Sequence, residues 1–455
     1  MSAKITFSTY GKTIAVFWVI FAIALFELAP GRFDRGFNTA CGIIYAVMCV
    51  SYFKIKKKKN YFDFDTLFII TYFCVMLYFA VFMYSTDPER FIVFRYKYNT
   101  NLISKGSALA ILGMASYMAG SIWQGNKVKQ NSVKPMTLPH TELFALSAAS
   151  FLAYIAMGGW HNLYVGYMGG RTVDAEGSNY MAVFAYITLF CLMIVWFNNA
   201  YLKNSHHFYL NKIPLPELLY AAFIIIIYLI ASSRATPMRI VLIFFGLYTV
   251  LYRNFSLKKM LILVVVGMAA MFAMQQYRAG YLYDSNNIVF ADVISDLIFN
   301  ARHTYVALDY VDHHGLNWGR SMISYLASPI PFLNGFILRV TGIHVYESTS
   351  AGFFSVETLG TNSNWGLGTN IISDIYISFG TVGVAVMMFM LGFLISKLHA
   401  NAKRNIYYLT AYIIMLAYSV VLVRCEYFFP LRSLLWALAI IYILRLCRLT
   451  YGKKV

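Results

Sequence analysis

The chain has 455 residues, of which 60% are hydrophobic and only 12% are charged, and its formal net charge is +18. Soluble globular proteins average roughly 45–50% apolar and about 25% charged residues, so this composition excludes an ordinary soluble domain. Apolar runs close to the roughly 20 residues that cross a bilayer recur from end to end, and within lipid such runs must be helices.

The first predicted helix, at 13–30, is interpreted as a retained membrane span. It carries Glu27 and has no small-residue cleavage site after it, unlike a signal peptide that is removed. Further apolar segments follow along the whole chain. We predict an all-α, polytopic membrane protein with about twelve transmembrane helices, at 13–30, 38–53, 66–84, 104–123, 142–160, 181–202, 217–233, 238–252, 260–277, 371–396, 406–423 and 433–447.

A short basic loop after the second predicted span sets the orientation of the chain. It contains Lys54, Lys56, Lys57, Lys58 and Lys59. Cytoplasmic loops collect lysine and arginine, so the second span is expected to end in the cytoplasm. Both termini are then predicted to be cytoplasmic.

The longest segment between predicted spans divides the chain into three parts. Residues 1–277 hold the first nine predicted spans, 278–370 form one large outer loop, and 371–455 hold the last three spans and a cytoplasmic tail. Loops of this length are usually functional. Within the loop, 289–310 has helical periodicity, 328–331 (Ser-Pro-Ile-Pro) breaks the chain, and the apolar stretch 332–345 has a composition that permits it to enter the membrane.

Positive charges differ in kind between the two predicted sides. Inner segments carry 18 lysines and 4 arginines, whereas outer segments carry 13 arginines and 2 lysines, which together account for the 37 cations of the chain. Inner lysines are explained by topology and by anionic lipids. Fourteen of the nineteen acids also lie outside, so any chemistry is expected on the outer face.

Five outer arginines are candidate anion-binding residues because they flank tight turns or end a span: Arg234, Arg239, Arg278, Arg424 and Arg432. The planar guanidinium binds phosphate oxygens through two hydrogen bonds and stays charged. A pyrophosphate carried on a lipid is the simplest ligand. The alternative is that these arginines extend to the membrane surface and pair with outer acids such as Glu426.

Acids and histidines of the loop are candidates for a general base, which takes a proton from an acceptor hydroxyl. The alternative is a solvated polar loop. Asp309, Asp312 and His313 would share one helical face, but no second ligand pair is evident and no metal is predicted. The set consists of His303, Asp309, Asp312, His313, His314, His344, Glu347, Glu357 and Asp374.

The pair Asp63 and Asp65, separated by Phe64, has the Asp-x-Asp pattern that holds a divalent ion in some glycosyltransferases. Here it follows the basic cytoplasmic loop at the inner end of a span. Acids are favoured at helix N-termini because they complement the helix dipole. We therefore reject a catalytic role for this pair.

Four motifs lie in the second half of the chain. A Ser-Arg turn (233–235) lies between central spans, and Tyr277-Arg278 opens the large loop. The loop closes on Asn-Trp-Gly-Leu-Gly (364–368) before a span with Ser-Phe-Gly-Thr-Val-Gly (378–383), and Arg424-Cys425-Glu426 follows the penultimate span. With these motifs the chain resembles the Wzy-type polymerases of O-antigen or oligosaccharide repeat units, most clearly over 220–440. Arg424 precedes Glu426 with Cys425 between them, whereas some members have Arg-Glu directly, which weakens a role for Glu426 more than one for Arg424.

The resemblance implies a glycosyltransferase of the bacterial inner membrane with a GT-C-like helical fold. It would transfer a growing glycan from undecaprenyl pyrophosphate onto a new lipid-linked repeat unit at the periplasmic face. Arg234, Arg278 and Arg424 would hold pyrophosphates, with Arg239 and Arg432 as further candidates. The leading candidates for the base are Glu357, Glu347 and His344.

The same resemblance implies the partners. These are the undecaprenyl-pyrophosphate-linked oligosaccharide, the lipid bilayer, a separate chain-length regulator (a polysaccharide co-polymerase) and a flippase. A glycosyl pyrophosphate is already activated and arginine donors can stabilise the leaving group, so no cofactor, metal or nucleic acid is expected.

Two other functions remain open. An O-antigen ligase shares the donor, the topology and a large outer loop, but transfers polymer to the lipid A core, and the sequence does not separate it from a polymerase. A lipid-linked oligosaccharide flippase would carry charges deep within its spans, which are almost free of them here. A structural protein would leave the outer arginines unexplained.

Overall fold

The structure is a computed structural model that describes residues 2–124, 136–165, 178–203, 213–231, 234–279, 289–362 and 366–451. Side chains are not described for 2–8, 162, 164–165, 271, 274–279 and 450–451. Over the described residues helices are the only regular secondary structure, and there is no strand. The prediction of an all-α protein is confirmed.

Each of the twelve predicted spans coincides with a helix. Six helices are long and apolar enough to cross a membrane, and α3, α8, α9 and α18 are shorter apolar helices. The chain is therefore a polytopic membrane protein, while the number of twelve spans stays a prediction. The helices are α1 (Ser2–Glu27), α2 (Arg35–Ile55), α3 (Phe64–Met76), α4 (Ile103–Trp123), α5 (Thr141–Tyr154), α7 (Ser178–Lys203), α8 (Leu215–Ile230), α9 (Ala235–Leu251), α10 (Leu257–Ala279), α17 (Ile371–Asn401), α18 (Ile406–Tyr418) and α19 (Leu431–Tyr451).

The third predicted span, 66–84, is interrupted. Helix α3 ends at Met76, and a π-helical turn, Phe79–Met83, continues it. A short helix α6 (Trp160–Val165) likewise follows the π-helical turn Ile155–Gly159 after α5. Gly158 has φ +95° there, a conformation that glycine adopts without a steric penalty.

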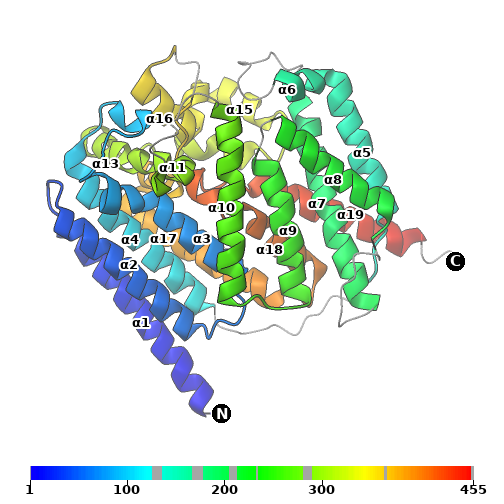
Figure 1. Cartoon of the computed structure of the whole chain (residues 1–455), viewed down its shortest axis with the longest axis horizontal. Coiled ribbons are helices and arrows are strands. Elements are labelled where there is room, and N and C mark those ends of the chain that lie inside the picture. The colour runs from blue at the N-terminus through cyan, green and yellow to red at the C-terminus, as the bar shows by residue number, and fades with distance from the viewer. Residues whose placement is uncertain are drawn as a thin grey trace.

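The described part of the large loop folds into short helices that gather at one end of the bundle, opposite the N-terminus (Figure 1). The segment 289–310 forms three helices rather than one, and the predicted break at 328–331 separates α14 from α15, as expected. The loop helices are α11 (Phe290–Val293), α12 (Ser295–Ile298), α13 (Arg302–His314), α14 (Ile323–Ala327), α15 (Leu333–Thr341) and α16 (Ser350–Leu359).

Helices α4 and α17 form the centre of the bundle and touch backbone to backbone. A Cβ atom at Gly120 would lie 1.9 Å from the carbonyl oxygen of Phe389, and one at Gly392 would lie 2.0 Å from that of Tyr117. Small residues allow membrane helices to approach this closely, because packing replaces the hydrophobic effect within lipid.

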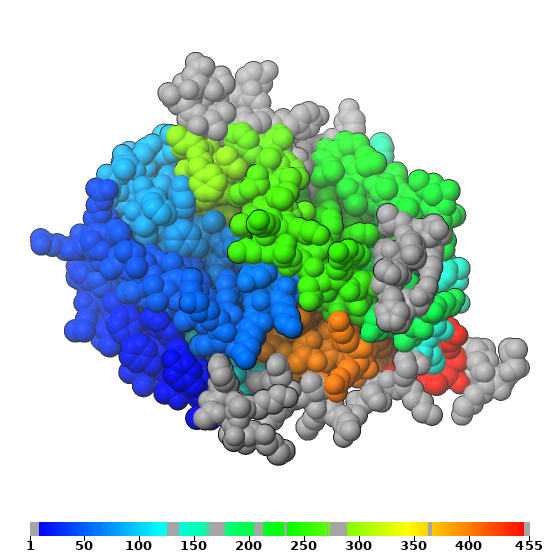
Figure 2. Space-filling model, turned by 60° about the horizontal axis from the view of Figure 1, so that its bottom comes forward, coloured from blue at the N-terminus to red at the C-terminus, as the bar shows by residue number. Residues whose placement is uncertain are grey.

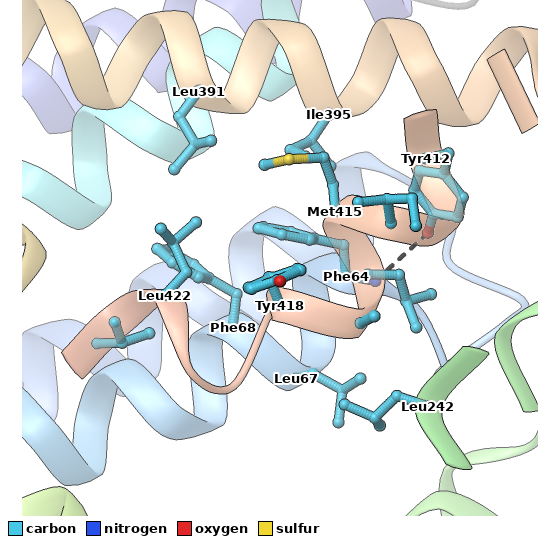
Figure 3. Packing of buried hydrophobic residues seen from close by; sticks show 14 of the residues in the cluster. Phe64, Leu67, Phe68, Leu242, Leu391, Ile395, Tyr412, Met415, Tyr418 and Leu422 are labelled. Carbon is cyan, nitrogen blue, oxygen red and sulfur yellow. Dashed lines mark hydrogen bonds between the residues drawn. The ribbon is translucent and has the colours of Figure 1, made fainter. Parts of the chain in front are cut away.

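Helices α3, α17 and α18 close the end of the core that lies opposite the loop helices. Phe64 and Phe68 pack with Leu391, Ile395 and Met415 in one apolar cluster (Figure 3). The backbone N–H of Phe64 donates to the hydroxyl of Tyr412 over 3.3 Å. This contact ties the first turn of α3 to α18.

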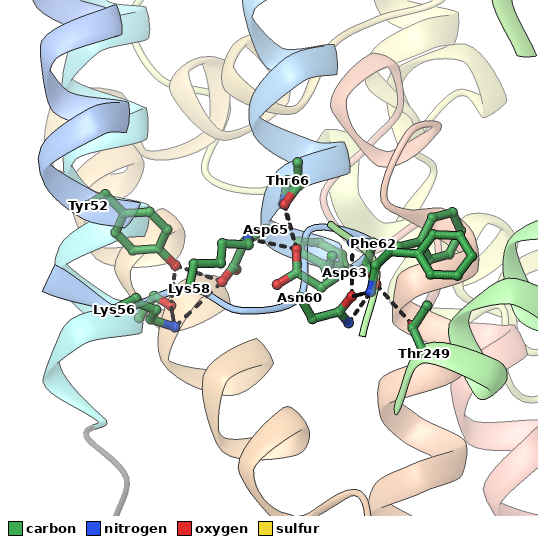
Figure 4. Close-up of polar contacts among 12 residues, drawn as sticks. Tyr52, Lys56, Lys58, Asn60, Phe62, Asp63, Asp65, Thr66 and Thr249 are labelled. Atoms are coloured by element: carbon green, nitrogen blue, oxygen red, sulfur yellow. Dashed lines mark hydrogen bonds and ion pairs between the residues drawn. The ribbon is translucent and has the colours of Figure 1, made fainter. Parts of the chain in front are cut away.

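Asp63 and Asp65 have structural partners at the same end of the bundle (Figure 4). Asp63 accepts the N–H of Thr66 as the N-cap of α3 and pairs with Lys58 at 2.7 Å. Asp65 accepts the hydroxyl groups of Tyr52 at 2.7 Å and Tyr117 at 2.5 Å. The two acids cap and connect helices, in agreement with the role expected of acids at a helix N-terminus.

Candidate functional site

Two of the five predicted arginines meet on one carboxylate at the loop end of the bundle. Arg234 directly precedes α9, and its Nη2 atom lies 2.5 Å from Oδ2 of Asp296 in α12. Arg424 lies in the turn Leu422–Arg424, and its Nη1 atom is 3.9 Å from the same Oδ2 and 3.3 Å from the backbone oxygen of Asp296. The carboxylate of Asp296 therefore links the two guanidinium groups.

A third predicted arginine, Arg239, lies buried in the first turns of α9 and is only 7% exposed. Its Nη1 atom donates to the hydroxyl of Tyr418 over 3.3 Å, and its Cζ atom lies 4.6 Å from the Tyr418 ring and 5.8 Å from the Tyr186 ring. Its Nε atom is buried without a hydrogen-bond partner, and no described carboxylate forms an ion pair with it. A buried charge without a countercharge is costly, and the partners described for Arg239 are aromatic residues.

Two buried acids, Glu426 and Asp374, join the loop to the bundle beside these arginines. Glu426 is 3% exposed and accepts the N–H of Ala351 over 3.2 Å. Asp374, in the first turn of α17, accepts the N–H of Tyr427 over 2.9 Å and lies close enough to Glu426 for their charges to interact. Burial raises the pKa of Glu426 above its ordinary value of 4.5.

Cys425 lies between the two sets of charged groups. Burial raises the pKa of its thiol to about 12, and the neighbouring Glu426 adds to the rise, while Arg424 and Arg239 oppose it. The thiol therefore lies within electrostatic range of both arginines and of the buried acid. The turn 422–426 brings the arginine cluster and the carboxyl pair together.

A break in α17 holds the loop in place. Gly380 has φ +62°, a conformation that side-chain-bearing residues rarely adopt, and it interrupts the helix within the motif 378–383. The interruption allows the carbonyl of Ile377 to accept the N–H of Asn317 from the loop over 2.9 Å. The hydroxyl groups of Ser321 and Ser378 lie 3.2 Å apart and add a second contact. The glycine thus creates the docking point for the loop.

A model of the family described as O-antigen polysaccharide polymerase Wzy matches residues 13–454, nearly the whole chain. The chain belongs to this family. No curated protein and no solved structure matches it. Membership confirms the resemblance and implies a membrane-embedded, glycosyltransferase-type polymerase with a lipid-linked oligosaccharide as substrate.

In this Wzy-family polymerase the three predicted candidates for the base lie at the outer rim of the loop. Glu357 is exposed on α16, Glu347 is half-buried in the turn Val345–Ser348, and His344 is exposed with its ring stacked on Tyr346 at 5.4 Å. Burial raises the pKa of the Tyr310 hydroxyl, and Glu357 and Glu347 raise it further. Both carboxylates therefore lie within electrostatic range of the Tyr310 hydroxyl, as does Arg320, which opposes them, and neither carboxylate forms an ion pair with a described arginine.

The remaining two predicted arginines have different surroundings. Arg432, at the start of α19, places its Cζ atom 6.0 Å from the ring of Trp436, whose Nε1 donates to the carbonyl of Pro329 over 2.7 Å. Arg278 belongs to the last turns of α10, but its side chain lies outside the described residues. Its role as a pyrophosphate ligand stays a prediction.

His303 is the loop histidine least able to act as a base. It is fully buried, and burial together with the neighbouring Arg302 lowers the pKa of its imidazole to about 3. Arg302 itself donates to Thr358 at 2.9 Å and to the carbonyl of Lys97 at 2.8 Å. Both residues therefore anchor α13 inside the loop.

The acids of α13 have protein partners. Asp309 accepts the amide of Asn99 over 2.9 Å, and Asp312 lies 3.6 Å from Lys105. Over the described part of the chain, no three His, Cys, Asp or Glu side chains are grouped so that they could hold a metal ion.

Sequence reasoning missed two features of this site. Asp296 is not among the candidates from the sequence, and Asp374 is only one of nine polar loop candidates. The available signal for Asp374 was an acid in the first turn of a span, directly after a polar segment. For Asp296 the sequence offers no signal, because its partners come from two distant turns.

Proposed function

We propose that this polymerase transfers a growing glycan from undecaprenyl pyrophosphate onto a new lipid-linked repeat unit at the periplasmic face of the bacterial inner membrane. The observation that carries the proposal is the gathering of Arg234, Arg239 and Arg424 at the loop end of the bundle. Asp296 contacts both Arg234 and Arg424, and Arg239 forms no ion pair with a described carboxylate. Three guanidinium groups placed together suit a pyrophosphate.

The chemical step follows from this placement. The acceptor hydroxyl oxygen attacks the anomeric carbon, the bond from that carbon to the phosphate oxygen breaks, and the lipid pyrophosphate leaves as an anion. The hydroxyl proton passes to a base. Arg239, Arg234 and Arg424, together with Arg278, stabilise the charge that develops on the leaving group, an effect strengthened where water is excluded.

Glu357, Glu347 and His344 are the proposed bases because they are accessible to an acceptor sugar at the rim. Glu426 and Asp374 are too buried for that contact and instead act as positioning residues. Their hydrogen bonds to the backbone of Ala351 and Tyr427 fix the loop against the turn that carries Arg424. Arg432, which faces Trp436, is proposed as a further contact to the lipid-linked donor.

The orientation in the membrane is proposed with the loop periplasmic and both termini cytoplasmic. The lysines of the second loop, Lys56 and Lys58, lie at the end of the bundle opposite the loop helices, which supports this orientation (Figures 1 and 4). A GT-C-like architecture, the three-part division at 277 and 370, and action with a flippase and a chain-length regulator belong to the same proposal.

Deletion of the gene from the native host tests this function. Surface polysaccharide is examined on a gel, and undecaprenyl-linked glycan is extracted and sized. Single repeat units on the lipid A core without a ladder would support the polymerase. Long polymer left on undecaprenyl pyrophosphate with unmodified core would identify a ligase, and single repeat units confined to the inner leaflet would identify a flippase.

Complementation of the same strain tests the base. Glu357→Gln, Glu347→Gln and His344→Gln are compared with Glu426→Gln for the length of the polymer ladder. General bases typically contribute about 10²–10⁴-fold, so one rim variant is expected to abolish the ladder while its protein level stays normal. Normal ladders in all three rim variants would show that none of these three residues is the base.

A further inference from the structure

A cationic cavity lies at the end of the bundle opposite the loop. It has a volume of about 50 Å³, enough for several water-sized groups. Its walls come from the ends of α7 and α9, the turn between α17 and α18, and α19. Figure 2 turns this end forward and shows the orange α17–α18 region beside the red end of α19.

Three cations line the cavity. Lys403 and Arg404 lie in the α17–α18 turn, and Arg445 lies on α19. Arginine is scarce on this side, where only 4 of 22 cations are arginine, yet two of those four face one cavity. Lysine sets the orientation of a membrane protein as well as arginine does. Two guanidinium groups at one cavity therefore favour the recognition of an anion.

No described acid neutralises these cations. None of the three forms an ion pair within the described ranges. Acids elsewhere at this end have partners of their own: Asp63 pairs with Lys58, Asp65 with Lys56, and Glu217 with His140. The cavity therefore holds uncompensated positive charge.

Hydrogen bonds fix the segments that form the walls of the cavity. The side chain of Asn199 exchanges two bonds with the backbone of Leu138, at 2.9 and 2.7 Å. Asn405 caps α18 by accepting the N–H of Tyr407 over 2.9 Å, and Arg445 lies over the Tyr407 ring at 5.7 Å. A site organised in advance loses less entropy when its ligand binds.

The lining is amphiphilic. Leu202, Leu251 and Leu409 form apolar walls beside the cations. A phosphate group next to an acyl chain has the complementary pattern, and basic pockets between transmembrane helices on the cytoplasmic side are suited to lipid head groups.

We propose that the cavity lined by Lys403, Arg404 and Arg445, at the end of the bundle opposite the loop helices, binds a phosphate group. An anionic phospholipid and a soluble phosphate present the same chemistry. The cavity is separate from the arginines of the loop end, so this proposal does not depend on the proposed function.

Binding is tested on the full-length protein in nanodiscs of phosphatidylcholine alone or with phosphatidylglycerol. The retention of phosphatidylglycerol is measured by native mass spectrometry, with and without millimolar inorganic phosphate. The cavity variant carries Lys403→Gln, Arg404→Gln and Arg445→Gln. The matched control removes three cations of the same face outside the cavity, Arg253→Gln, Lys258→Gln and Lys259→Gln.

The wild type and the control are expected to retain phosphatidylglycerol over phosphatidylcholine, and the cavity variant to lose this preference by roughly fivefold for each cation removed. Competition by inorganic phosphate would assign the site to a soluble phosphate, and its absence to the lipid. Equal losses in the cavity variant and the control, or no preference in the wild type, would overturn the proposal. Arg445→Gln alone gives the same readout if the triple variant does not fold.

Discussion

The Nη2 atom of Arg234 lies 2.5 Å from Oδ2 of Asp296, and the same carboxylate also approaches Arg424. The contact joins the start of α9 to a loop helix and to the turn before α19. It holds the two guanidinium groups close together on one carboxylate. In the proposed function, the pyrophosphate would replace this carboxylate as the ligand of both groups.

A double-mutant cycle between Arg234→Ala and Asp296→Asn tests whether this pair acts as a unit. Residues in contact typically show coupling of about 0.5–3 kcal/mol. We expect Arg234→Ala to lower the polymerisation rate by about tenfold or more, and the double variant to lose less than the two single losses combined. The rate is measured on purified protein with Arg339→Ala, an exposed arginine on α15, as control. If the effects of the two substitutions on the rate are strictly additive, Asp296 does not contribute to the function of Arg234.

Arg278→Ala tests the arginine whose side chain lies outside the described residues. A donor aimed at developing charge is typically worth at least tenfold, so polymer yield in the complemented deletion strain should fall by about that factor or more. Protein abundance in the membrane is measured in parallel. A smaller loss in properly folded enzyme would remove Arg278 from the core mechanism.

Gly120→Ala tests the central packing of α4 on α17. Its new Cβ would lie 1.9 Å from the carbonyl oxygen of Phe389, so the two backbones must separate. We expect a large loss of folded protein, measured by monodisperse yield and thermal stability in detergent. Gly267→Ala on α10 is the control, because no atom lies within 4 Å of its new Cβ. Equal stability of the two variants would contradict the close contact.

The buried imidazole of His303 predicts a dependence of stability on pH. Its pKa is lowered from 6.5 to about 3, so the folded protein favours the neutral ring. The stabilisation is present above about pH 6.5 and is lost as the pH falls from there toward 3. Thermal stability between pH 7.5 and 5 should therefore fall less in His303→Gln than in the wild type. Parallel curves for both proteins would show that His303 is accessible to protons in the folded state.

Hydrophobic runs predicted the helices well, because each span must satisfy its own backbone and shows its apolar length locally. The interruption of α3 after Met76 and the break of α17 at Gly380 were not predicted, since both depend on contacts with other segments. The excess of outer arginines predicted a charged site. It could not show that Asp296 joins Arg234 to Arg424, or that Arg239 is buried without a described carboxylate. Such pairings are set by tertiary packing and leave no periodic pattern in the sequence.

Polymerisation by Arg239 variants tests the central claim most directly. Purified protein in nanodiscs receives a defined undecaprenyl-pyrophosphate-linked repeat unit, and product length is followed over time for the wild type, Arg239→Lys, Arg239→Ala and the control Arg339→Ala. Loss of one such donor is typically worth about 10²–10³-fold. The account predicts a fall of that order for Arg239→Ala, a smaller fall for Arg239→Lys and none for the control. A rate for folded Arg239→Ala similar to that of the wild type would contradict the assignment of this arginine to the pyrophosphate.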